Sequence, residues 1–195
     1  FALLQYLVPQ HLLSRLVGTL ADSQIGWIKN SFIGIFNRLY DINMQEAVIE
    51  EPDRYPSFNA FFTRALKADA RPIDPDPSRI VCPADGAVSQ IGEIAHGRVF
   101  QAKGRSYSLT TLLGGDSSVA EHFVNGRFAT IYLSPKDYHR VHMPVEGRLR
   151  EMIYVPGQLF SVNDATVREV PNLFARNERL VALFDTPVGP MAMVL

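Results

Sequence analysis

The sequence has little cysteine, little net charge and no long hydrophobic run, and each absence removes a class of protein. A single cysteine, Cys82, among 195 residues excludes an internal disulfide and is typical of a reducing compartment. The formal net charge of −1, without basic clusters, excludes the electrostatic footprint of a nucleic-acid binder. No CxxC pair, HExxH motif, Gly-rich phosphate loop or GxSxG elbow is present. We therefore expect one globular unit of modest size, with 47% hydrophobic residues.

The N-terminal 40 residues carry apolar side chains at helical spacing and predict two helices, over residues 9–20 and 25–39. Polar and charged residues interrupt both segments, so neither offers the roughly 20 consecutive apolar residues that span a bilayer. Two interpretations stay open: the helices pack on their own domain, or they lie in the membrane interface. The candidates for membrane contact are Leu12, Leu16, Leu20, Trp27, Ile28, Phe32 and Phe36.

A proline-rich connector is expected at residues 51–79, with one short helix over residues 57–64. Beyond it, the residues predict strands at 80–82, 87–91, 98–100, 128–133, 148–155 and 180–184. The expected fold class is α+β. N-terminal amphipathic helices (1–50) and the connector (51–79) precede a mainly antiparallel, sandwich- or barrel-like β core at 80–195.

Two turns of this core share the pattern Pro-x-acid-Gly-x-apolar, at residues 83–88 and 144–149. Each is predicted to begin a strand, and paired turns of this kind occur in duplicated half motifs of lipoyl-type β-sandwiches. The repeat is an argument for the fold only. Just before the first turn, Cys82 follows an apolar run and precedes Pro83, a context that favours a buried small hydrophobe over a nucleophile.

One segment places His139 and His142 three residues apart. Ser134 and Asp137 are typical of a helix N-terminus, in which the Asp137 carboxylate accepts a hydrogen bond from the Ser134 amide. If one helical turn gives way to extended chain near residue 141, both rings can point into one cleft. Histidine titrates near pH 6.5, so the pair, with the upstream carboxylate of Asp85, indicates acid–base chemistry. The alternative is two ordinary histidines satisfied by backbone groups.

Five ordered blocks resemble the signature blocks of bacterial phosphatidylserine decarboxylase proenzymes. They are Pro83-Ala-Asp-Gly86, Gln101-Ala-Lys-Gly-Arg-Ser-Tyr-Ser-Leu109, Tyr132-Leu-Ser-Pro-Lys-Asp-Tyr-His-Arg-Val-His-Met-Pro144, Pro156-Gly-Gln-Leu-Phe-Ser-Val-Asn163 and Pro171-Asn-Leu-Phe-Ala-Arg-Asn-Glu-Arg179. The resemblance implies a pyruvoyl-dependent enzyme that decarboxylates phosphatidylserine to phosphatidylethanolamine through a Schiff base. It also implies that the proenzyme cuts itself before a serine of a Leu-Gly-Ser-Thr motif, and that this serine becomes the pyruvoyl group of a small (alpha) chain.

That motif does not occur in these residues, which end at Met191-Ala-Met-Val-Leu195. The chain is therefore expected to be most of the large (beta) chain, inactive without the small chain as its partner. Because the implied substrate is a membrane phospholipid, the resemblance favours a peripheral location at the cytoplasmic face of the cell membrane. Homodimers of the two-chain unit are compatible with the sequence.

Carried over residue by residue, the resemblance assigns Asp85 and His142 to the self-cleavage triad, with the serine as third member. It makes His139 the leading acid for protonating the decarboxylated intermediate, and His142 the second. Six residues of the other blocks are candidates for the head-group pocket, with strand-end and loop packing as the alternative: Lys103, Tyr107, Ser161, Asn163, Phe174 and Asn177. The charged side chains of Lys103 and Arg176 are candidates for contact with the lipid phosphate.

Two other classes of function remain open. One is a metal-dependent hydrolase that uses Asp137, His139 and His142, although no metal site is predicted. The other is a non-catalytic β-sandwich protein of the membrane surface. A lipoyl-like carrier is disfavoured, because the turn at residues 144–147 lacks the lysine that such a carrier exposes.

Overall fold

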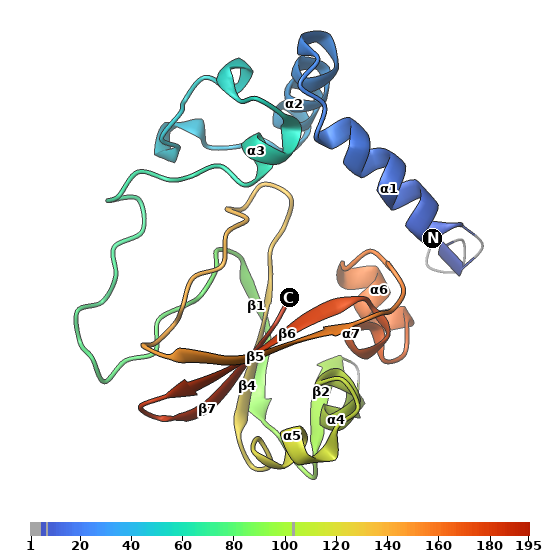
Figure 1. Ribbon diagram of the computed structural model, residues 1–195, viewed down its shortest axis with the longest axis vertical. Coiled ribbons are helices and arrows are strands. Elements are labelled where there is room, and N and C mark those ends of the chain that lie inside the picture. Colours follow the sequence, from blue (N-terminus) through green and yellow to red (C-terminus); the bar gives the residue numbers. More distant parts are fainter. Residues whose placement is uncertain (1–4, 7, 103) are drawn as a thin grey trace. The chain divides into compact units, whose positions relative to one another are not determined.

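A computed structural model describes residues 5–6, 8–102 and 104–195 (Figure 1). Contacts group the chain into two compact units that interleave in sequence. Of the described residues, the first unit comprises 5–6, 8–11, 88–102, 104–130 and 146–195, and the second comprises 12–87 and 131–145. The units follow spatial contacts, so they cut across the three consecutive regions expected from composition.

An antiparallel sheet of three strands forms much of the first unit. Its order is β5 (Arg148–Val155), β6 (Arg179–Thr186) and β7 (Gly189–Val194), with β6 in the centre. Alternate side chains of a strand face the same side, and Val181 and Leu183 of β6 are fully buried on that face. β6 turns into β7 at Gly189, whose φ of 117° favours glycine.

Two further sheets have two strands each. β1 (Ala87–Glu93) pairs with β4 (Arg127–Tyr132), and β2 (Arg98–Ala102) forms an antiparallel hairpin with β3 (Arg105–Ser108). The mixed helix-and-strand architecture and the antiparallel sheets match the expected fold class. The predicted barrel-like closure is wrong for the described strands, because they form three separate sheets with free edges.

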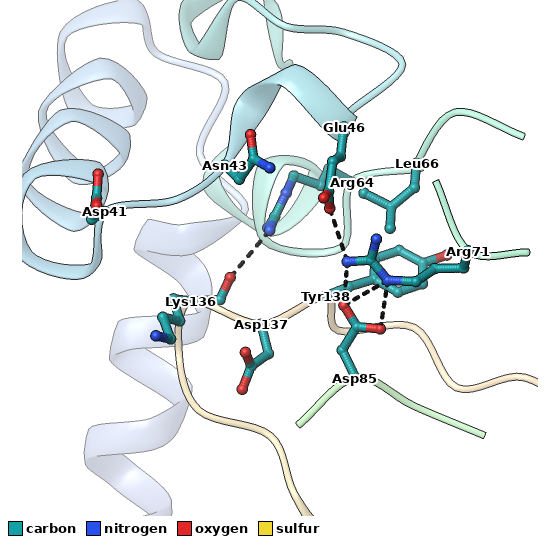
Figure 2. Close-up of a pocket in the computed structure, with 10 residues that line it drawn as sticks. All are labelled: Asp41, Asn43, Glu46, Arg64, Leu66, Arg71, Asp85, Lys136, Asp137 and Tyr138. Atoms are coloured by element: carbon teal, nitrogen blue, oxygen red, sulfur yellow. Dashed lines mark hydrogen bonds and ion pairs between the residues drawn. The ribbon is translucent and has the colours of Figure 1, made fainter. Parts of the chain in front are cut away.

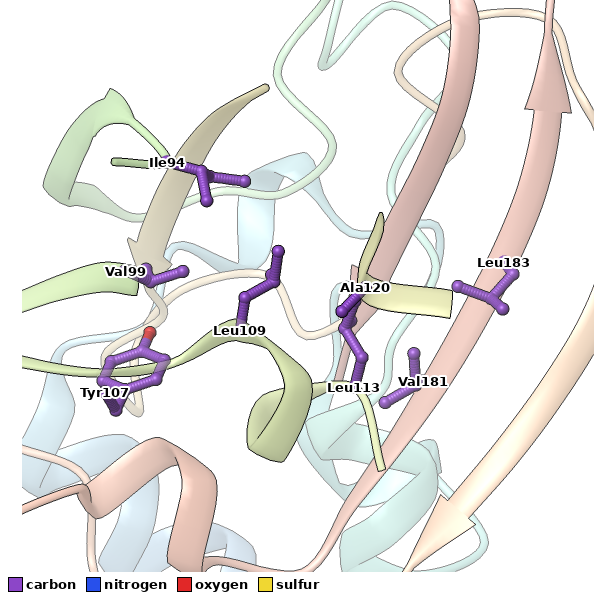
Figure 3. Packing of buried hydrophobic residues seen from close by; sticks show 8 residues of the cluster. All are labelled: Ile94, Val99, Tyr107, Leu109, Leu113, Ala120, Val181 and Leu183. Carbon is purple, nitrogen blue, oxygen red and sulfur yellow. The ribbon is translucent and has the colours of Figure 1, made fainter. Parts of the chain in front are cut away.

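Short helices cover the core of the first unit: α4 (Leu109–Leu112), α5 (Ser117–Glu121), α6 (Asp164–Glu169) and α7 (Leu173–Arg176). Figure 3 shows the main buried cluster, which consists of Ile94, Val99, Tyr107, Leu109, Leu113, Ala120, Val181 and Leu183. Gln101 of β2 is buried beside it. Its amide donates to the carbonyls of Val167 (2.8 Å) and Val170 (3.0 Å) and accepts from the Leu173 amide (3.0 Å), which ties β2 to α6 and α7.

The second unit holds helices α2 (Gly26–Tyr40) and α3 (Phe58–Phe62), most of α1 (Gln10–Ala21), and the 3-10 turns η2 (Met44–Glu46) and η3 (Pro52–Arg54). Its hydrophobic core cluster consists of Ile33, Ile42, Tyr55 and Phe61, and the rings of Phe36 and Phe58 pack against them. Edge-to-face contacts dominate, as between Phe36 and Phe58 at 5.1 Å. Residues 63–86 follow as turns, bends and irregular chain with no helix or strand.

The two long helices and the short helix near residue 60 are confirmed. No helix among the described residues is long and apolar enough to cross a membrane. The strand expected at residues 80–82 is wrong, because this stretch makes only an isolated backbone contact, from Val81 to Pro144. The prediction that Cys82 is buried is also wrong. Cys82 is exposed, and its thiol donates to the Ala84 carbonyl (3.1 Å).

Candidate active site

Two extended segments of the second unit place Asp85 beside the histidine segment. The Val81 amide donates to the Pro144 carbonyl (2.9 Å), and the His142 amide donates to the Pro83 carbonyl (2.8 Å). Gly86, at φ 136°, then leads into β1; a Cβ there would collide with the carbonyl oxygen of Tyr132. The turns at residues 83–88 and 144–149 both lead directly into strands, β1 and β5, as the sequence predicted.

The Asp85 carboxylate is held by Arg71 (Figure 2). Arg71 Nε lies 2.9 Å from Oδ1 and Nη2 lies 2.6 Å from Oδ2, so the contact is bidentate. Glu46 contacts the same guanidinium at 2.8 Å. The hydrogen bonds from Arg71 lower the pKa of Asp85 despite its partial burial. Asp85 is therefore an ionised carboxylate at neutral pH.

The His142 ring is bound to Tyr138. The Tyr138 hydroxyl lies 2.9 Å from His142 Nε2, and the two rings stack with centroids 5.5 Å apart and planes 23° apart. Asp85 and His142 thus lie on paired segments, but the Asp85 carboxylate accepts its hydrogen bonds from Arg71. The predicted Asp85–His142 pairing is not among the contacts of the described residues.

His139 has a different environment. Its Nδ1 lies 2.8 Å from the Asp137 carbonyl oxygen, and its ring packs on Phe62 with centroids 3.9 Å apart. A carbonyl only accepts hydrogen bonds, so Nδ1 carries the proton and Nε2 of the neutral ring is a proton acceptor. In its protonated form the ring can deliver a proton from Nε2.

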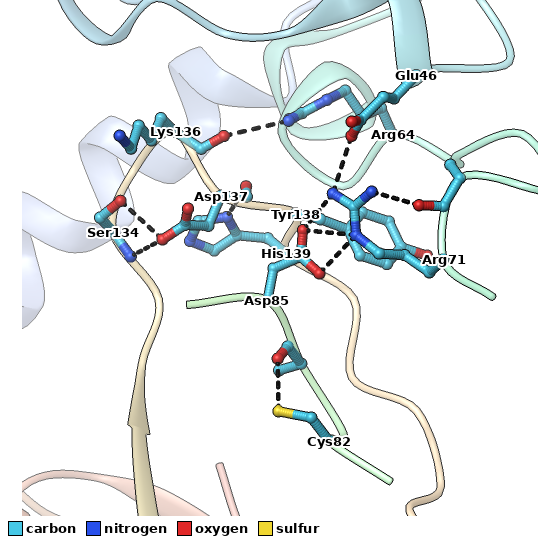
Figure 4. A network of polar contacts seen from close by, with 12 residues as sticks. Glu46, Arg64, Arg71, Cys82, Asp85, Ser134, Lys136, Asp137, Tyr138 and His139 are labelled. Atoms are coloured by element: carbon cyan, nitrogen blue, oxygen red, sulfur yellow. Dashed lines mark hydrogen bonds and ion pairs between the residues drawn. The ribbon is translucent and has the colours of Figure 1, made fainter. Parts of the chain in front are cut away.

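The turn before His139 is fixed by Asp137 (Figure 4). Its carboxylate accepts from both the amide and the hydroxyl of Ser134, each at 2.7 Å, which confirms the predicted contact between Asp137 and the Ser134 amide. The segment is a β-turn and not the predicted helical turn. The Asp137 amide donates to the Ser134 carbonyl (2.9 Å), and the chain extends directly afterwards.

A hollow of about 290 Å³ lies beside these residues, lined by Asp41, Asn43, Glu46, Arg64, Leu66, Arg71, Asp85, Lys136, Asp137 and Tyr138 (Figure 2). Neither histidine ring lines it, contrary to the expectation that both point into one cleft. Arg64 is 4% exposed and donates to the Lys136 carbonyl (3.2 Å), while its Nε and Nη1 have no partner within the described part of the chain. Burial lowers the pKa of Arg64.

Comparison with known proteins identifies the family. The phosphatidylserine decarboxylase family model matches residues 58–195, and a second model, described as PSD, matches residues 1–41. The chain belongs to the phosphatidylserine decarboxylase family. The phosphatidylserine decarboxylase proenzyme of Ectopseudomonas mendocina is 63% identical over 195 residues, which are all of this chain and 68% of the relative. The proenzymes of Alcanivorax borkumensis and Azotobacter vinelandii are each 64% identical and are covered over 67% and 68% of their lengths.

Three of the candidates for the decarboxylase head-group pocket have packing or capping contacts, all in the first unit. Tyr107 is buried against Phe174, with ring centroids 5.9 Å apart, and burial raises the pKa of Tyr107 to about 12. Asn163 caps α6 by accepting from the amides of Ala165 and Thr166 (3.0 Å each).

The remaining candidates from the family blocks are tied to neighbouring chain or lie outside the described residues. Asn177 exchanges two hydrogen bonds with the Phe160 backbone, and Ser161 accepts one from the Asn163 side chain. Arg176, a candidate for phosphate contact, lies over the Phe160 ring at 5.2 Å. Lys103 lies outside the residues that the structure describes.

Within the described residues, no group of three or more histidine, cysteine or acidic side chains is spaced to hold a metal ion. Of the three candidates for a metal site, the Asp137 carboxylate contacts Ser134, His139 Nδ1 contacts the Asp137 backbone carbonyl, and the His142 ring contacts Tyr138.

Sequence reasoning missed four residues of this site: Phe62, Arg64, Arg71 and Tyr138. Tyr138 had a usable signal, since it stands inside the histidine segment. The arginines had none, because their contacts depend on residues 14 and 72 positions away.

Proposed function

We propose that this chain is part of an enzyme that decarboxylates phosphatidylserine to phosphatidylethanolamine, using a pyruvoyl group formed by self-cleavage of a proenzyme. The observation that carries the proposal is the identity of about 63% across all 195 residues to proteins named phosphatidylserine decarboxylase proenzymes. The word proenzyme supports maturation into two chains. The serine that becomes the pyruvoyl group is then supplied by a small chain, the partner of these residues.

In self-cleavage, His142 takes the proton from the serine hydroxyl as its oxygen attacks the preceding carbonyl carbon. Asp85 steadies the ring in the tautomer that accepts this proton and balances the charge of the imidazolium. The depressed pKa of Asp85 supports this role, because the carboxylate stays ionised. To hydrogen bond with the His142 ring directly, the Asp85 carboxylate must give up one of its hydrogen bonds from Arg71.

In turnover, the pyruvoyl group supplies an electrophilic carbonyl that accepts the electron pair released when carbon dioxide leaves. His139 delivers the proton that replaces the lost carboxyl group. Its Nδ1 is held by the Asp137 carbonyl and one ring face is covered by Phe62, so Nε2 is the atom that moves the proton. This arrangement fits a positioned acid, whose loss costs about 10²–10⁴ in rate.

Membrane association through the N-terminal helices accounts for access to a lipid substrate. Leu12, Leu16 and Leu20 are exposed on α1, and Trp27 at the start of α2 is 74% exposed. Ile28, Phe32 and Phe36 are only partly exposed; Phe32 and Phe36 pack on α3 and Phe36 on the second unit's core, which favours α1 and Trp27 as the lipid contact. The location that follows is peripheral, at the cytoplasmic face of the cell membrane.

The remaining features belong to the same proposal. The two turn-and-strand units at residues 83–88 and 144–149 support a duplicated, lipoyl-type half motif. Residues 1–50 act as the membrane-associating region, 51–79 as the connector and 80–195 as the catalytic core. Pairing of two such heterodimers is the assembly we propose.

Intact mass spectrometry of the protein expressed from its complete reading frame tests the proposal. Wild type should give two chains, the smaller one lighter by one ammonia than a chain that begins with serine. His142→Ala should remain one chain, whereas His139→Ala should be cut and then decarboxylate about 10²–10⁴ times more slowly. A wild-type protein that stays one unmodified chain refutes the pyruvoyl mechanism, and a fully active His139→Ala refutes the role of His139.

Vesicle flotation tests the membrane contact separately. The triple variant Leu12→Ser, Leu16→Ser and Leu20→Ser should bind anionic phospholipid vesicles at least 10-fold more weakly, because each leucine contributes about 1.5–3 kcal/mol when buried. A matched control changes Ile73 and Ile80 to serine, two apolar residues that are also exposed but lie outside the helices. Equal binding of both variants would exclude α1 as the lipid contact.

A further inference from the structure

Tyr138 binds one residue of the proposed triad and lies beside the other. Its hydroxyl lies 2.9 Å from His142 Nε2, and it lines the same hollow as Asp85. Tyr138 is only 7% exposed, whereas His142 is exposed. Within the described part of the chain, Tyr138 is the only residue hydrogen bonded to the His142 ring.

The hydrogen bond between the Tyr138 hydroxyl and Nε2 bears on which ring nitrogen of His142 carries the proton. A phenol oxygen can accept, but its own hydrogen then needs a separate acceptor. Within the described residues the Tyr138 hydroxyl has no partner other than His142 Nε2, so donation to Nε2 is the arrangement that satisfies it. Nε2 is then unprotonated, and the proton of the neutral imidazole sits on Nδ1.

We propose that Tyr138 is a positioning residue for self-cleavage, whose hydroxyl holds His142 in the tautomer with a proton on Nδ1 and an unprotonated Nε2. The inference rests on the proposed function. This tautomer leaves Nε2 as the base for the serine hydroxyl and directs an N–H from Nδ1 toward a carboxylate. The serine hydroxyl first takes the place of the phenol as the hydrogen-bond partner of Nε2, and then gives its proton to this nitrogen.

The two rings also stack, so the contribution of the hydroxyl can be separated from that of the Tyr138 ring. Centroids 5.5 Å apart and planes inclined by 23° mean that the Tyr138 ring also restrains the plane of the imidazole. Tyr138→Phe keeps this ring and its buried volume and removes the hydrogen bond alone. Loss of one such hydrogen bond should slow self-cleavage by about 3- to 10-fold.

The experiment compares the full-length wild type with Tyr138→Phe. The time course of chain cleavage gives the rate, and ¹⁵N spectra of histidine-labelled protein give the tautomer, with His142 signals assigned by His142→Gln. We expect a protonated Nδ1 and an unprotonated Nε2 in wild type, and a gain of protonated Nε2 in the variant. His139 is the internal control, because its Nδ1 donates to the Asp137 carbonyl and its spectrum should not change.

Three results overturn the inference: a wild-type His142 protonated on Nε2, a tautomer that Tyr138→Phe leaves unchanged, or cleavage of the variant at or above the wild-type rate. A wild-type protein that never cleaves refutes the proposed function instead, and its ¹⁵N spectrum still decides whether Tyr138 sets the tautomer.

Discussion

Two buried arginines, one in each unit, show how differently the units are built. Arg179 in the first unit is 6% exposed and donates to four carbonyls, those of Thr111 (2.6 Å), Leu112 (2.7 Å), Asn177 (2.8 Å) and Ala175 (3.0 Å). Arg64 in the second unit is as deeply buried but makes one hydrogen bond, and two of its nitrogens have no partner among the described residues. Burial lowers the pKa of both.

The contrast teaches where this fold satisfies its polar groups and where it does not. In the first unit, buried polar side chains such as Gln101 and Arg179 bind backbone carbonyls and join the loops to an aliphatic core. In the second unit, Arg64, two of whose nitrogens lack a hydrogen-bond partner among the described residues, borders the hollow with Asp85 and Tyr138. Natural sequences depart from local consistency mainly at functional sites, which supports the second unit as the seat of chemistry.

The largest expected effect tests this comparison directly, with each arginine changed to methionine in a separate variant. Arg179→Met leaves four carbonyls without a donor and should lower the free energy of unfolding by about 3–5 kcal/mol. Arg64→Met removes a buried charge with one hydrogen bond and should change it by no more than about 1 kcal/mol. Urea denaturation of both variants measures the difference. Equal losses would show that Arg64 has a partner equivalent to those of Arg179.

A smaller effect is expected from pH and concerns Tyr107 in the first unit. Burial raises the pKa of Tyr107 to about 12, above the unfolded value of about 10. Its contribution to stability is therefore complete below about pH 10 and is lost as the pH rises toward 12, a change of about 2–3 kcal/mol. Tyr107→Phe should flatten the stability curve of the protein above pH 10. The free energy of unfolding is measured by urea denaturation at each pH. If it falls equally steeply above pH 10 in wild type and variant, the deep burial of the phenol is contradicted.

The smallest effect compares helix caps in the two units. Asn163 accepts from two amides at the start of α6, whereas Ser57 accepts from one, that of Ala60 (3.2 Å), at the start of α3. Asn163→Ala should cost about 1–2 kcal/mol and Ser57→Ala about 0.5–1 kcal/mol, as measured by thermal unfolding. If Asn163 only caps α6, its variant keeps the wild-type KM. A raised KM would instead support a role for Asn163 in binding the lipid head group.

Much of the local structure could be predicted from the sequence. Helical spacing found α1 and α2, and short apolar segments found β1, β2, β4, β5 and β6. The Ser134–Asp137 contact was also predictable, because it spans three residues. The strands β3 and β7 and the helices α4 to α7 were missed, since each is short and has little periodicity or apolar character of its own.

The sequence by itself determined the family and the apolar faces of the two long helices, and it singled out Asp85, His139 and His142 as candidates for the site. Only the tertiary structure decided that Asp85 meets Arg71 and that His139 meets Phe62. The physical reason is the range of the interactions. Helix spacing and turn hydrogen bonds act between residues a few positions apart, whereas Arg71 reaches Asp85 and Phe62 reaches His139 only after distant segments have packed together.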